Sequence, residues 1–194
     1  MSKLEQFFKR GNPQNVTDHL AKMRNPANIA TALQHENWRV RLAAAEALGR
    51  IGKEAAPFAA QALKHEDSDV REAAADALGL IGPAAAPFAK DIVEQALKHE
   101  DRKVRYAATE ALGRIGKEAA PFAAQALKHE NRKVRYAAAR AAKRIGNAEV
   151  LPELEKARDR ETDLSVKRHI EYAIRASQPG IFRRLIGRLK RRKT

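Results

Sequence analysis

Apolar residues recur along the chain at intervals of three and four positions, which is the spacing of one face of an α-helix. One such stripe, in the segment 37–52, consists of Val40, Ala43, Ala44, Ala47, Leu48 and Ile51. Asn37 can cap the first turn of this helix with its side chain, and Gly52 can close its last turn in a left-handed conformation. No segment alternates apolar and polar residues in the manner of a β-strand. The pattern therefore predicts an all-α protein.

The helical pattern returns about every 30 residues. A Val-Arg step marks the copies at Val40, Val70, Val104 and Val134, and a Val-Lys step marks a weaker fifth copy at Val166. Each longer helix is followed by a shorter one that begins at a proline, where proline loses no intrahelical hydrogen bond. These prolines are Pro57, Pro87 and Pro121. Because one helix pair cannot bury its apolar face alone, the units are expected to stack into an α-solenoid of about five pairs with capping helices at both ends.

One short helix carries four additional residues, with PFAKDIVEQALKHE in place of PFAAQALKHE. Four residues are close to one helical turn. The insertion is therefore expected to lengthen the helix while keeping Phe88 and Leu97 on nearly the same face.

The predicted chain has three parts. N-terminal capping helices occupy residues 1–25, the repeats occupy 26–177, and a basic amphipathic helix or tail occupies 178–194. The residues expected to anchor the N-terminal cap are Leu4, Phe7 and Phe8 in a first helix and Val16, Leu20 and Met23 in a second.

The unit pattern points to a known family. The motif D-x-x-V-R-x-A-A-x-A-L-G-x-I-G, present as DSDVREAAADALGLIG at 67–82, resembles the HEAT-like repeat, especially the short form of bilin-lyase-type proteins. The resemblance covers roughly residues 26–177. It implies that the longer helices line the concave side of the solenoid. It also implies that the arginines after the valines form a structural ladder between units; these are Arg41, Arg71, Arg105 and Arg135.

A His-Glu pair recurs at His35, His65, His99 and His129. Such pairs hold two irons in deoxyhypusine hydroxylase, a HEAT-repeat enzyme, but there they follow the Val-Arg step, whereas here they precede the helix. Equivalent residues of stacked units lie about 10 Å apart, whereas ligands of one metal ion lie about 3–4 Å from each other. We therefore interpret the pairs as parts of a turn, where Lys and His near a helix C-terminus supply donors and positive charge. The sequence predicts no metal site and no cofactor.

Composition narrows the function further. The chain has no cysteine, no glycine-rich phosphate loop and no Ser-His-Asp order, so we predict that it is not an enzyme. No run approaches the roughly 18 apolar residues of a membrane span, and we expect a cytoplasmic protein. The formal net charge is +14. Seven of the positive charges lie in the tail, at Arg183, Arg184, Arg188, Lys190, Arg191, Arg192 and Lys193.

A candidate binding groove follows from the positions that vary between units. Positions 39, 42, 46 and 50 and their equivalents share one arc of the longer helix. In the second unit this arc is acidic, whereas in units three to five it carries all three tyrosines among Lys and Arg. The predicted site consists of Lys103, Tyr106, Arg114, Lys133, Tyr136, Arg140, Arg144, Arg168 and Tyr172.

The leading hypothesis is a non-catalytic scaffold that binds a protein partner through this groove. A second hypothesis is a nucleic-acid-binding protein that uses the groove and the basic tail, since tyrosine and cations suit a phosphate-bearing strand. A third is a bilin-lyase-like protein, or one that associates with an anionic membrane surface through the tail.

Overall fold

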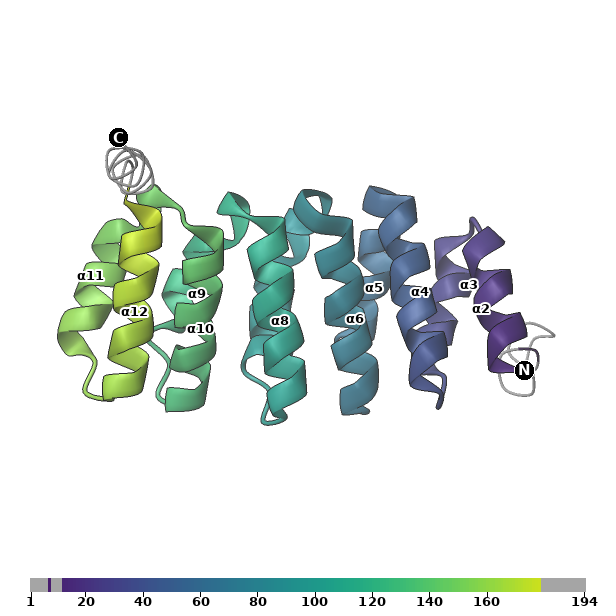
Figure 1. Ribbon diagram of the computed structural model, residues 1–194, viewed down its shortest axis with the longest axis horizontal. Coiled ribbons are helices and arrows are strands. Elements are labelled where there is room, and N and C mark those ends of the chain that lie inside the picture. Colours follow the sequence, from purple (N-terminus) through teal and green to yellow (C-terminus); the bar gives the residue numbers. More distant parts are fainter. Residues whose placement is uncertain (1–6, 8–11, 179–194) are drawn as a thin grey trace, which may run out of the picture.

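The computed structural model describes residues 7 and 12–178 and shows two layers of helices stacked side by side (Figure 1). The first layer contains α2 (Pro13–Lys22), α4 (Trp38–Ile51), α6 (Ser68–Ile81), α8 (Arg102–Ile115), α10 (Arg132–Ile145) and α12 (Leu164–Ser177). The second layer contains α3 (Pro26–Thr31), α5 (Ala56–Ala62), α7 (Ala89–Ile92), α9 (Ala120–Ala126) and α11 (Leu151–Arg160). Short helical turns join the layers: η1 (Ala32–Gln34), η2 (Gly52–Ala55), η3 (Gly82–Phe88), η4 (Val93–Leu97), η5 (Lys117–Ala119) and η6 (Ala148–Val150). This arrangement confirms the predicted all-α solenoid.

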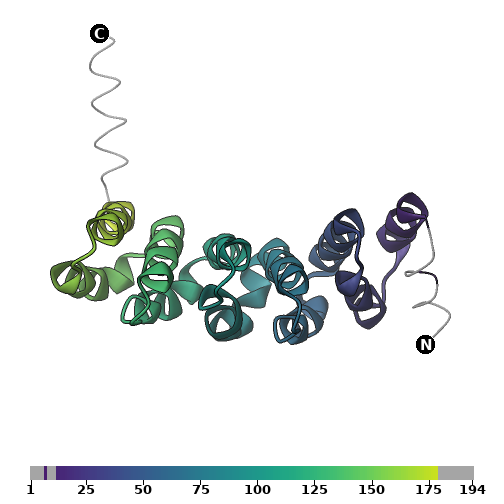
Figure 2. The same cartoon turned by 90° about the horizontal axis from the view of Figure 1, so that it is seen from below.

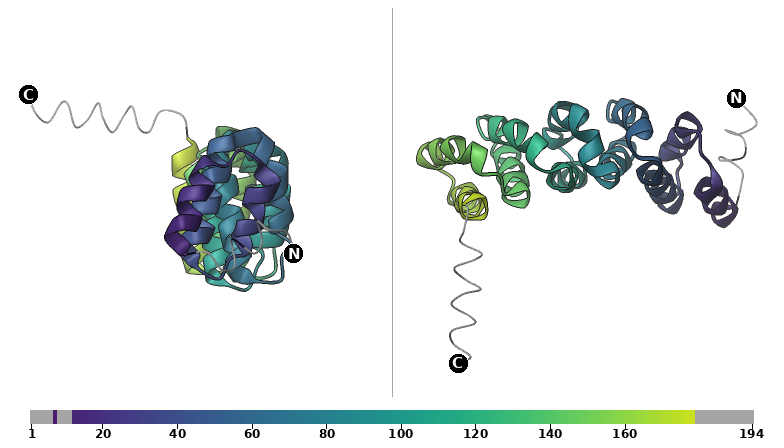
Figure 3. Two further views of the ribbon diagram at one scale, coloured as in Figure 1. Left: turned by 90° about the vertical axis from the view of Figure 1, so that its right-hand side faces the viewer. Right: turned by 90° about the horizontal axis from the view of Figure 1, so that it is seen from above.

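The row of helices bends gently toward the layer that contains α4 to α12 (Figures 2 and 3). Each of the five helices α4, α6, α8, α10 and α12 has 14 residues, and all begin along one edge of the molecule (Figure 1). The shallow concave face is therefore made of parallel helices of equal length.

Capping side chains explain why these helices begin where they do. Before α6, Asp67 accepts a hydrogen bond from the backbone N–H of Asp69 at 2.8 Å. Asn131 accepts from the N–H of Lys133 at 2.8 Å before α10. Each bond satisfies one free donor of a first helical turn. At the other end of α6, Gly82 has φ +69° and ψ −138°, a positive-φ conformation that glycine adopts at little cost, whereas Gly146 after α10 has the left-handed helical conformation expected for these closing glycines.

Small residues set the distance between neighbouring long helices. A Cβ atom on Gly79 of α6 would lie 3.0 Å from the Cα atom of Ala111 in α8, so the two backbones are in close contact. Larger side chains fill the space between the layers, where Leu63, Leu78 and Leu112 are fully buried. The core is therefore one continuous stripe along the solenoid.

The four-residue insertion lies in η3, α7 and η4. The helix that continues from Ala89 widens into a π-helical turn over Val93–Leu97, which accommodates the additional residues. Leu97 is fully buried, whereas Phe88 is partly buried against the core. The insertion lengthens this helix as expected, but through a π-helical turn.

At the N-terminal end, α2 packs against α4 and buries Val16 and Leu20. Phe7 is helical and contacts His19 edge to face, with ring centroids 5.1 Å apart. Leu4, Phe8 and the seven basic residues of the tail lie outside the described residues. The division of the chain at 25/26 and 177/178 stays a prediction. Within the described part, no helix is long and apolar enough to cross a membrane.

Candidate binding groove

The recurring histidines form part of the turns between helices. In each turn the imidazole Nδ1 accepts a hydrogen bond from the backbone N–H two residues later, at 2.9 to 3.1 Å. The four imidazoles are those of His35, His65, His99 and His129. The predicted location in the turn holds, but the chemistry is the reverse of the expected one, because the ring nitrogen accepts a hydrogen bond instead of donating one. In the described part of the chain, no group of three His, Cys, Asp or Glu residues could hold a metal ion.

The arginine of each Val-Arg step closes the same turn. Arg105 donates from Nη1 to the carbonyl oxygens of His99 and Glu100 at 2.8 and 2.6 Å. Arg41 makes the equivalent bonds and also pairs with Asp69 of the next unit at 2.6 Å. Arg41 and Arg135 thus join neighbouring units, as the family resemblance implies, whereas the hydrogen bonds of Arg71 and Arg105 stay within their own turns.

The fifth turn uses a carboxylate instead of an imidazole. Glu161 lies five residues before Val166, as His129 lies five residues before Val134. Its Oε1 accepts from the N–H of Asp163 at 3.0 Å, in the manner of the histidine nitrogen. The Arg135 guanidinium lowers the pKa of Glu161, and burial of the carboxylate opposes this effect.

Aromatic and cationic side chains alternate across the concave face of α8, α10 and α12. The Arg140 guanidinium lies 5.4 Å from the ring centroid of Tyr106. The Tyr136 ring lies 4.5 Å from the imidazole of His169, which in turn is 5.8 Å from the Tyr172 ring. The face therefore presents rings and positive charges from neighbouring helices side by side.

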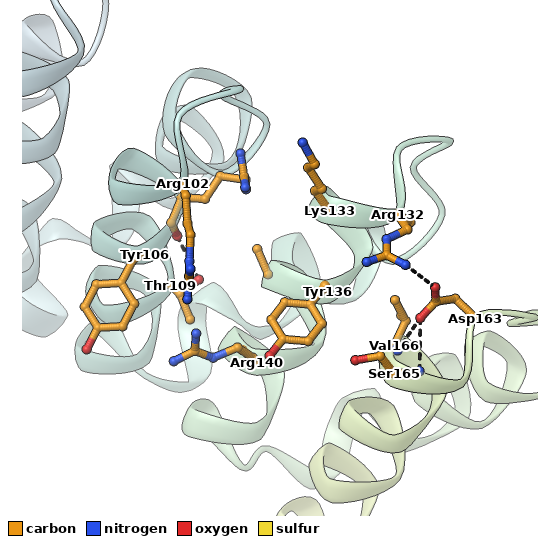
Figure 4. Close-up of a pocket in the computed structure, with 12 residues that line it drawn as sticks. Arg102, Tyr106, Thr109, Arg132, Lys133, Tyr136, Arg140, Asp163, Ser165 and Val166 are labelled. Atoms are coloured by element: carbon orange, nitrogen blue, oxygen red, sulfur yellow. Dashed lines mark hydrogen bonds and ion pairs between the residues drawn. The ribbon is translucent and has the colours of Figure 1, made fainter.

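A cavity of about 330 Å³ opens between the first halves of α8 and α10 and the start of α12 (Figure 4). It is lined by Arg102, Arg105, Tyr106, Thr109, Arg132, Lys133, Tyr136, Ala137, Arg140, Asp163, Ser165 and Val166. The Tyr106 ring is 51% exposed, whereas Tyr136 is half-buried against the core. The cavity therefore combines two aromatic walls with five cationic side chains and one carboxylate.

That single carboxylate already has a partner. Asp163 pairs with Arg132 at 2.6 Å and accepts hydrogen bonds from the N–H groups of Ser165 and Val166 (Figure 4). The Val166 bond and the Arg132 charge hold the pKa of Asp163 below its usual range. Its negative charge is thus balanced by Arg132 and by the N–H groups in the first turn of α12.

The remaining cations of the cavity form no ion pair within residues 12–178. Burial lowers the pKa of Arg105, and the neighbouring charge of Arg102 adds to this effect while Asp101 opposes it. Among the described residues, no acidic side chain forms an ion pair with Arg102, Lys133 or Arg140. The cavity is therefore a concentrated positive site.

The neighbouring part of the groove has the opposite charge. The pKa of Asp76 is raised to about 6, mainly by burial and also by the nearby charges of Glu72 and Glu110, while Arg114 opposes them. The pKa of Glu72 is also raised, mainly by burial. The groove is thus acidic along α6 and basic from α8 to α12.

The structure brings together only some of the residues predicted for the site. Tyr106, Lys133, Tyr136 and Arg140 line the cavity. The other predicted residues, which do not line it, are Lys103, Arg114, Arg144, Arg168 and Tyr172. Arg144 pairs with Glu110. The Lys143 ammonium lies 5.1 Å from the ring centroid of Tyr172.

Three arginines in the cavity were not predicted to belong to the site. Arg102 and Arg132 occupy the first position of α8 and α10, outside the arc of variable positions, and Arg105 was assigned a purely structural role. A sequence signal did exist, since Arg-Lys follows the capping residue in both units whereas Ser-Asp follows it in the second.

The stacked pairs, the repeated turns and the positive-φ glycines define an α-solenoid of short helical repeats. The family model for HEAT repeats matches residues 25–96 and 89–175, so the chain belongs to the HEAT-repeat family. A comparison with curated protein sequences gives no match.

Solved structures show the same fold. An archaeal HEAT-like repeats protein from Thermococcus onnurineus NA1 has a TM-score of 0.56 and 15% identity, over 91% of this chain and 80% of the other. A designed armadillo repeat protein in complex with the peptide (KR)4 has a TM-score of 0.52 and 13% identity, over 91% and 98%. An engineered protein has a TM-score of 0.51 and 21% identity, over 93% and 100%. At these identities the similarity extends to the fold alone.

Proposed function

We propose that this chain is a non-catalytic scaffold that binds a segment of a protein partner in the groove formed by α8, α10 and α12. The observation that carries the proposal is the cavity between Tyr106 and Tyr136, in which cations outnumber carboxylates. Exposed tyrosine and arginine side chains are the residues that most often dominate binding energy at protein interfaces. A solvated face would not need rings and cations arranged around a concave site.

The charges define the partner segment. Its side chains are acidic where it lies over α8 to α12, because Arg102, Lys133 and Arg140 have no acidic partner among the described residues. Toward α6, where Glu72 and Asp76 lie, the segment is neutral or basic. The designed armadillo repeat protein that was solved with (KR)4 is a precedent for peptide binding on a solenoid of similar fold. In the present chain the cavity has the charge that suits an acidic peptide.

Nucleic acid is the second candidate, because the same tyrosines and cations could stack on bases and contact phosphates. The salt dependence of the binding affinity distinguishes a nucleic-acid ligand from a peptide ligand. Neutralising about five phosphates would weaken binding by about 10²–10³ between 50 and 200 mM salt. A peptide held by tyrosine contacts depends less steeply on salt.

Fluorescence anisotropy of the full chain with defined probes tests the proposal. The probes are a labelled acidic peptide of Glu, Gly and Tyr, a basic peptide of Lys, Gly and Tyr, and a single-stranded RNA of similar length. We expect saturable binding of the acidic peptide, about tenfold weaker in Tyr106→Ala. Trp38→Ala is the matched control, since Trp38 is an exposed ring of α4, 60% accessible and outside the cavity. Tighter binding of RNA than of the acidic peptide, or an equal loss in both variants, would contradict the proposal.

A further inference from the structure

We infer that the cavity between α8 and α10 binds a phosphoryl group carried by a side chain of the partner segment. This inference rests on the proposed function and specifies the group that the groove recognises. It follows from three features of the cavity: the placement of cations at helix starts, the absence of acidic partners for three of them within the described part of the chain, and the acidic surface beside the cavity.

The first feature is the position of the positive charges. The N-terminal end of a helix carries a partial positive charge, so acidic residues are favourable in the first turn and basic residues are unfavourable. α6 has the favourable arrangement, with Asp69 in its first turn. α8 and α10 have no acid in their first turns and instead begin with Arg102-Lys103 and Arg132-Lys133. The two helices that frame the cavity therefore concentrate positive charge where folding alone disfavours it.

The second feature is that the cations of the cavity fall into two groups. Arg105 is held by the carbonyl oxygens of its turn, and Arg132 by Asp163. Arg102, Lys133 and Arg140 form no ion pair with any residue in the described part of the chain. They come from two neighbouring helices and all line the same cavity (Figure 4). Arg140 lies on the Tyr106 side of the cavity and Lys133 at its opposite end, so an anion that enters the cavity is attracted from both sides.

Tyr106 gives one of these cations a fixed position. The Arg140 guanidinium lies 5.4 Å from the ring centroid of Tyr106, within the range of a cation–π contact. A side chain held before the ligand arrives loses less conformational entropy on binding. The ring therefore prepares Arg140 for the anion and need not stack on the ligand itself.

The charge of the cavity exceeds what one carboxylate can neutralise. A phosphorylated side chain carries about −1.5 to −2 charges at neutral pH and three strong acceptor oxygens. Arg102, Lys133 and Arg140 supply donors and positive charge around the cavity, and the positive ends of α8 and α10 add to the attraction. A carboxylate brings one charge and two oxygens.

The third feature favours a single phosphoryl group over a nucleic-acid strand. A strand that continued along the groove would pass Glu72 and Asp76 on α6, which repel phosphates. A peptide can be neutral or basic at that point while presenting one phosphorylated residue to the cavity. The polarity of the groove therefore suits one localised dianion and not a continuous polyanion.

The test uses the full chain and a short labelled peptide of Glu, Gly and Ser with one central phosphoserine. Two control peptides of the same sequence, the serine twin and the glutamate twin, carry unmodified serine or glutamate at that position. We expect the phosphopeptide to bind about tenfold more tightly than the serine twin, and more tightly than the glutamate twin. Arg102→Ala and Lys133→Ala should reduce this preference to near one.

Two charge-matched variants serve as controls. Lys90→Ala removes an exposed charge from α7 in the opposite layer, and Lys117→Ala removes one from η5, beyond the end of α8 that is far from the cavity. Both should keep the preference for the phosphopeptide. Circular dichroism confirms that each variant is folded.

The outcomes are distinguishable. If the serine twin binds and Tyr106→Ala weakens it, but phosphorylation adds nothing, the inference is wrong and the proposed function stands. If no peptide binds, both are wrong. If the preference survives Arg102→Ala and Lys133→Ala, the phosphoryl group binds elsewhere and the inference is wrong. If a single-stranded RNA displaces the phosphopeptide and binds more tightly, the cavity is a nucleic-acid site instead.

Discussion

Glu161 and Arg135 form a two-pronged ion pair across the last turn of the solenoid, with Arg135 Nε 2.7 Å from Oε2 and Arg135 Nη2 3.0 Å from Oε1. The carboxylate is almost completely buried, with 3% of its side chain exposed. The pair joins the fourth unit to the fifth, where the earlier turns have a histidine. Its geometry explains why the pKa of Glu161 is lowered and that of Arg135 is raised: the hydrogen bonds between the two side chains are the largest cause in each case.

Replacing this carboxylate should destabilise the fold. Glu161→Gln keeps the shape but removes the charge, and we expect the free energy of unfolding at neutral pH to fall by about 1–3 kcal/mol. Urea denaturation followed by circular dichroism measures the change. Glu155→Gln on the exposed face of α11 is the matched control and should have little effect. An equal effect in both variants would show that the pair does not stabilise the turn.

The same pair gives the stability a defined dependence on pH. Because the folded-state pKa of Glu161 lies below its ordinary value of 4.5, its stabilisation is fully present above that value and is lost as the pH falls through the folded pKa. The difference between the wild type and Glu161→Gln should therefore shrink as the pH falls below about 4.5. A difference that stays constant down to pH 2 would contradict the assigned cause.

Asp76 predicts the opposite dependence. Its pKa is raised from 3.8 to about 6 by burial and by Glu72, so the folded state loses stability as the pH rises through this window. Asp76→Asn should raise the free energy of unfolding by about 1–3 kcal/mol at pH 8 and have almost no effect below pH 3.8. Glu46→Gln, at the equivalent exposed position of α4, serves as the control. A gain in stability from Asp76→Asn that is the same at both pH values would count against burial as the cause.

Close packing of α6 on α8 gives a test in two directions. In Gly79→Ala the new Cβ atom would approach the Ala111 backbone to 3.0 Å, and we expect a loss of about 1–3 kcal/mol despite the better helix propensity of alanine. In the fourth unit the equivalent residue is Lys143, which is exposed. Lys143→Gly should be about 0.5–1 kcal/mol less stable than Lys143→Ala through helix propensity alone. If Gly79→Ala proved stabilising, the result would contradict the close contact between the backbones of α6 and α8.

The turn histidines predict one tautomer. Since Nδ1 accepts from the backbone at His35, His65, His99 and His129, the neutral ring must carry its proton on Nε2. Long-range nitrogen–proton NMR spectra in mildly alkaline buffer should show this form for these four rings. His169 should differ, because its Nδ1 lies 2.9 Å from the Ser165 carbonyl oxygen and must donate. Mixed tautomers at the four turns would show that the histidines do not close them.

Local pattern was sufficient to predict the solenoid and the capping residues, because each unit repeats the same spacing and the first four units end their long helix at a glycine. The location of the histidines in the turns could also be predicted. Their role as acceptors could not, since it depends on the rotation of the ring toward the N–H two residues later.

The cavity depends on contacts between units. Arg102 and Arg132 look like ordinary first-turn residues until α8 and α10 are placed side by side. His169 appears isolated in the sequence, yet it lies between the rings of Tyr136 and Tyr172. Such juxtapositions arise from packing across about 30 residues of chain, and a repeat pattern does not encode which variable residues will meet.

Mapping the peptide contact directly tests whether the concave face is the binding surface. We predict that titration with the acidic peptide shifts the backbone amide resonances of the first halves of α8 and α10 and the start of α12, in a saturable manner. The amides of α5, α7, α9 and α11 should remain unchanged. Shifts concentrated on those four helices, or no saturable shifts in the groove, would contradict the account.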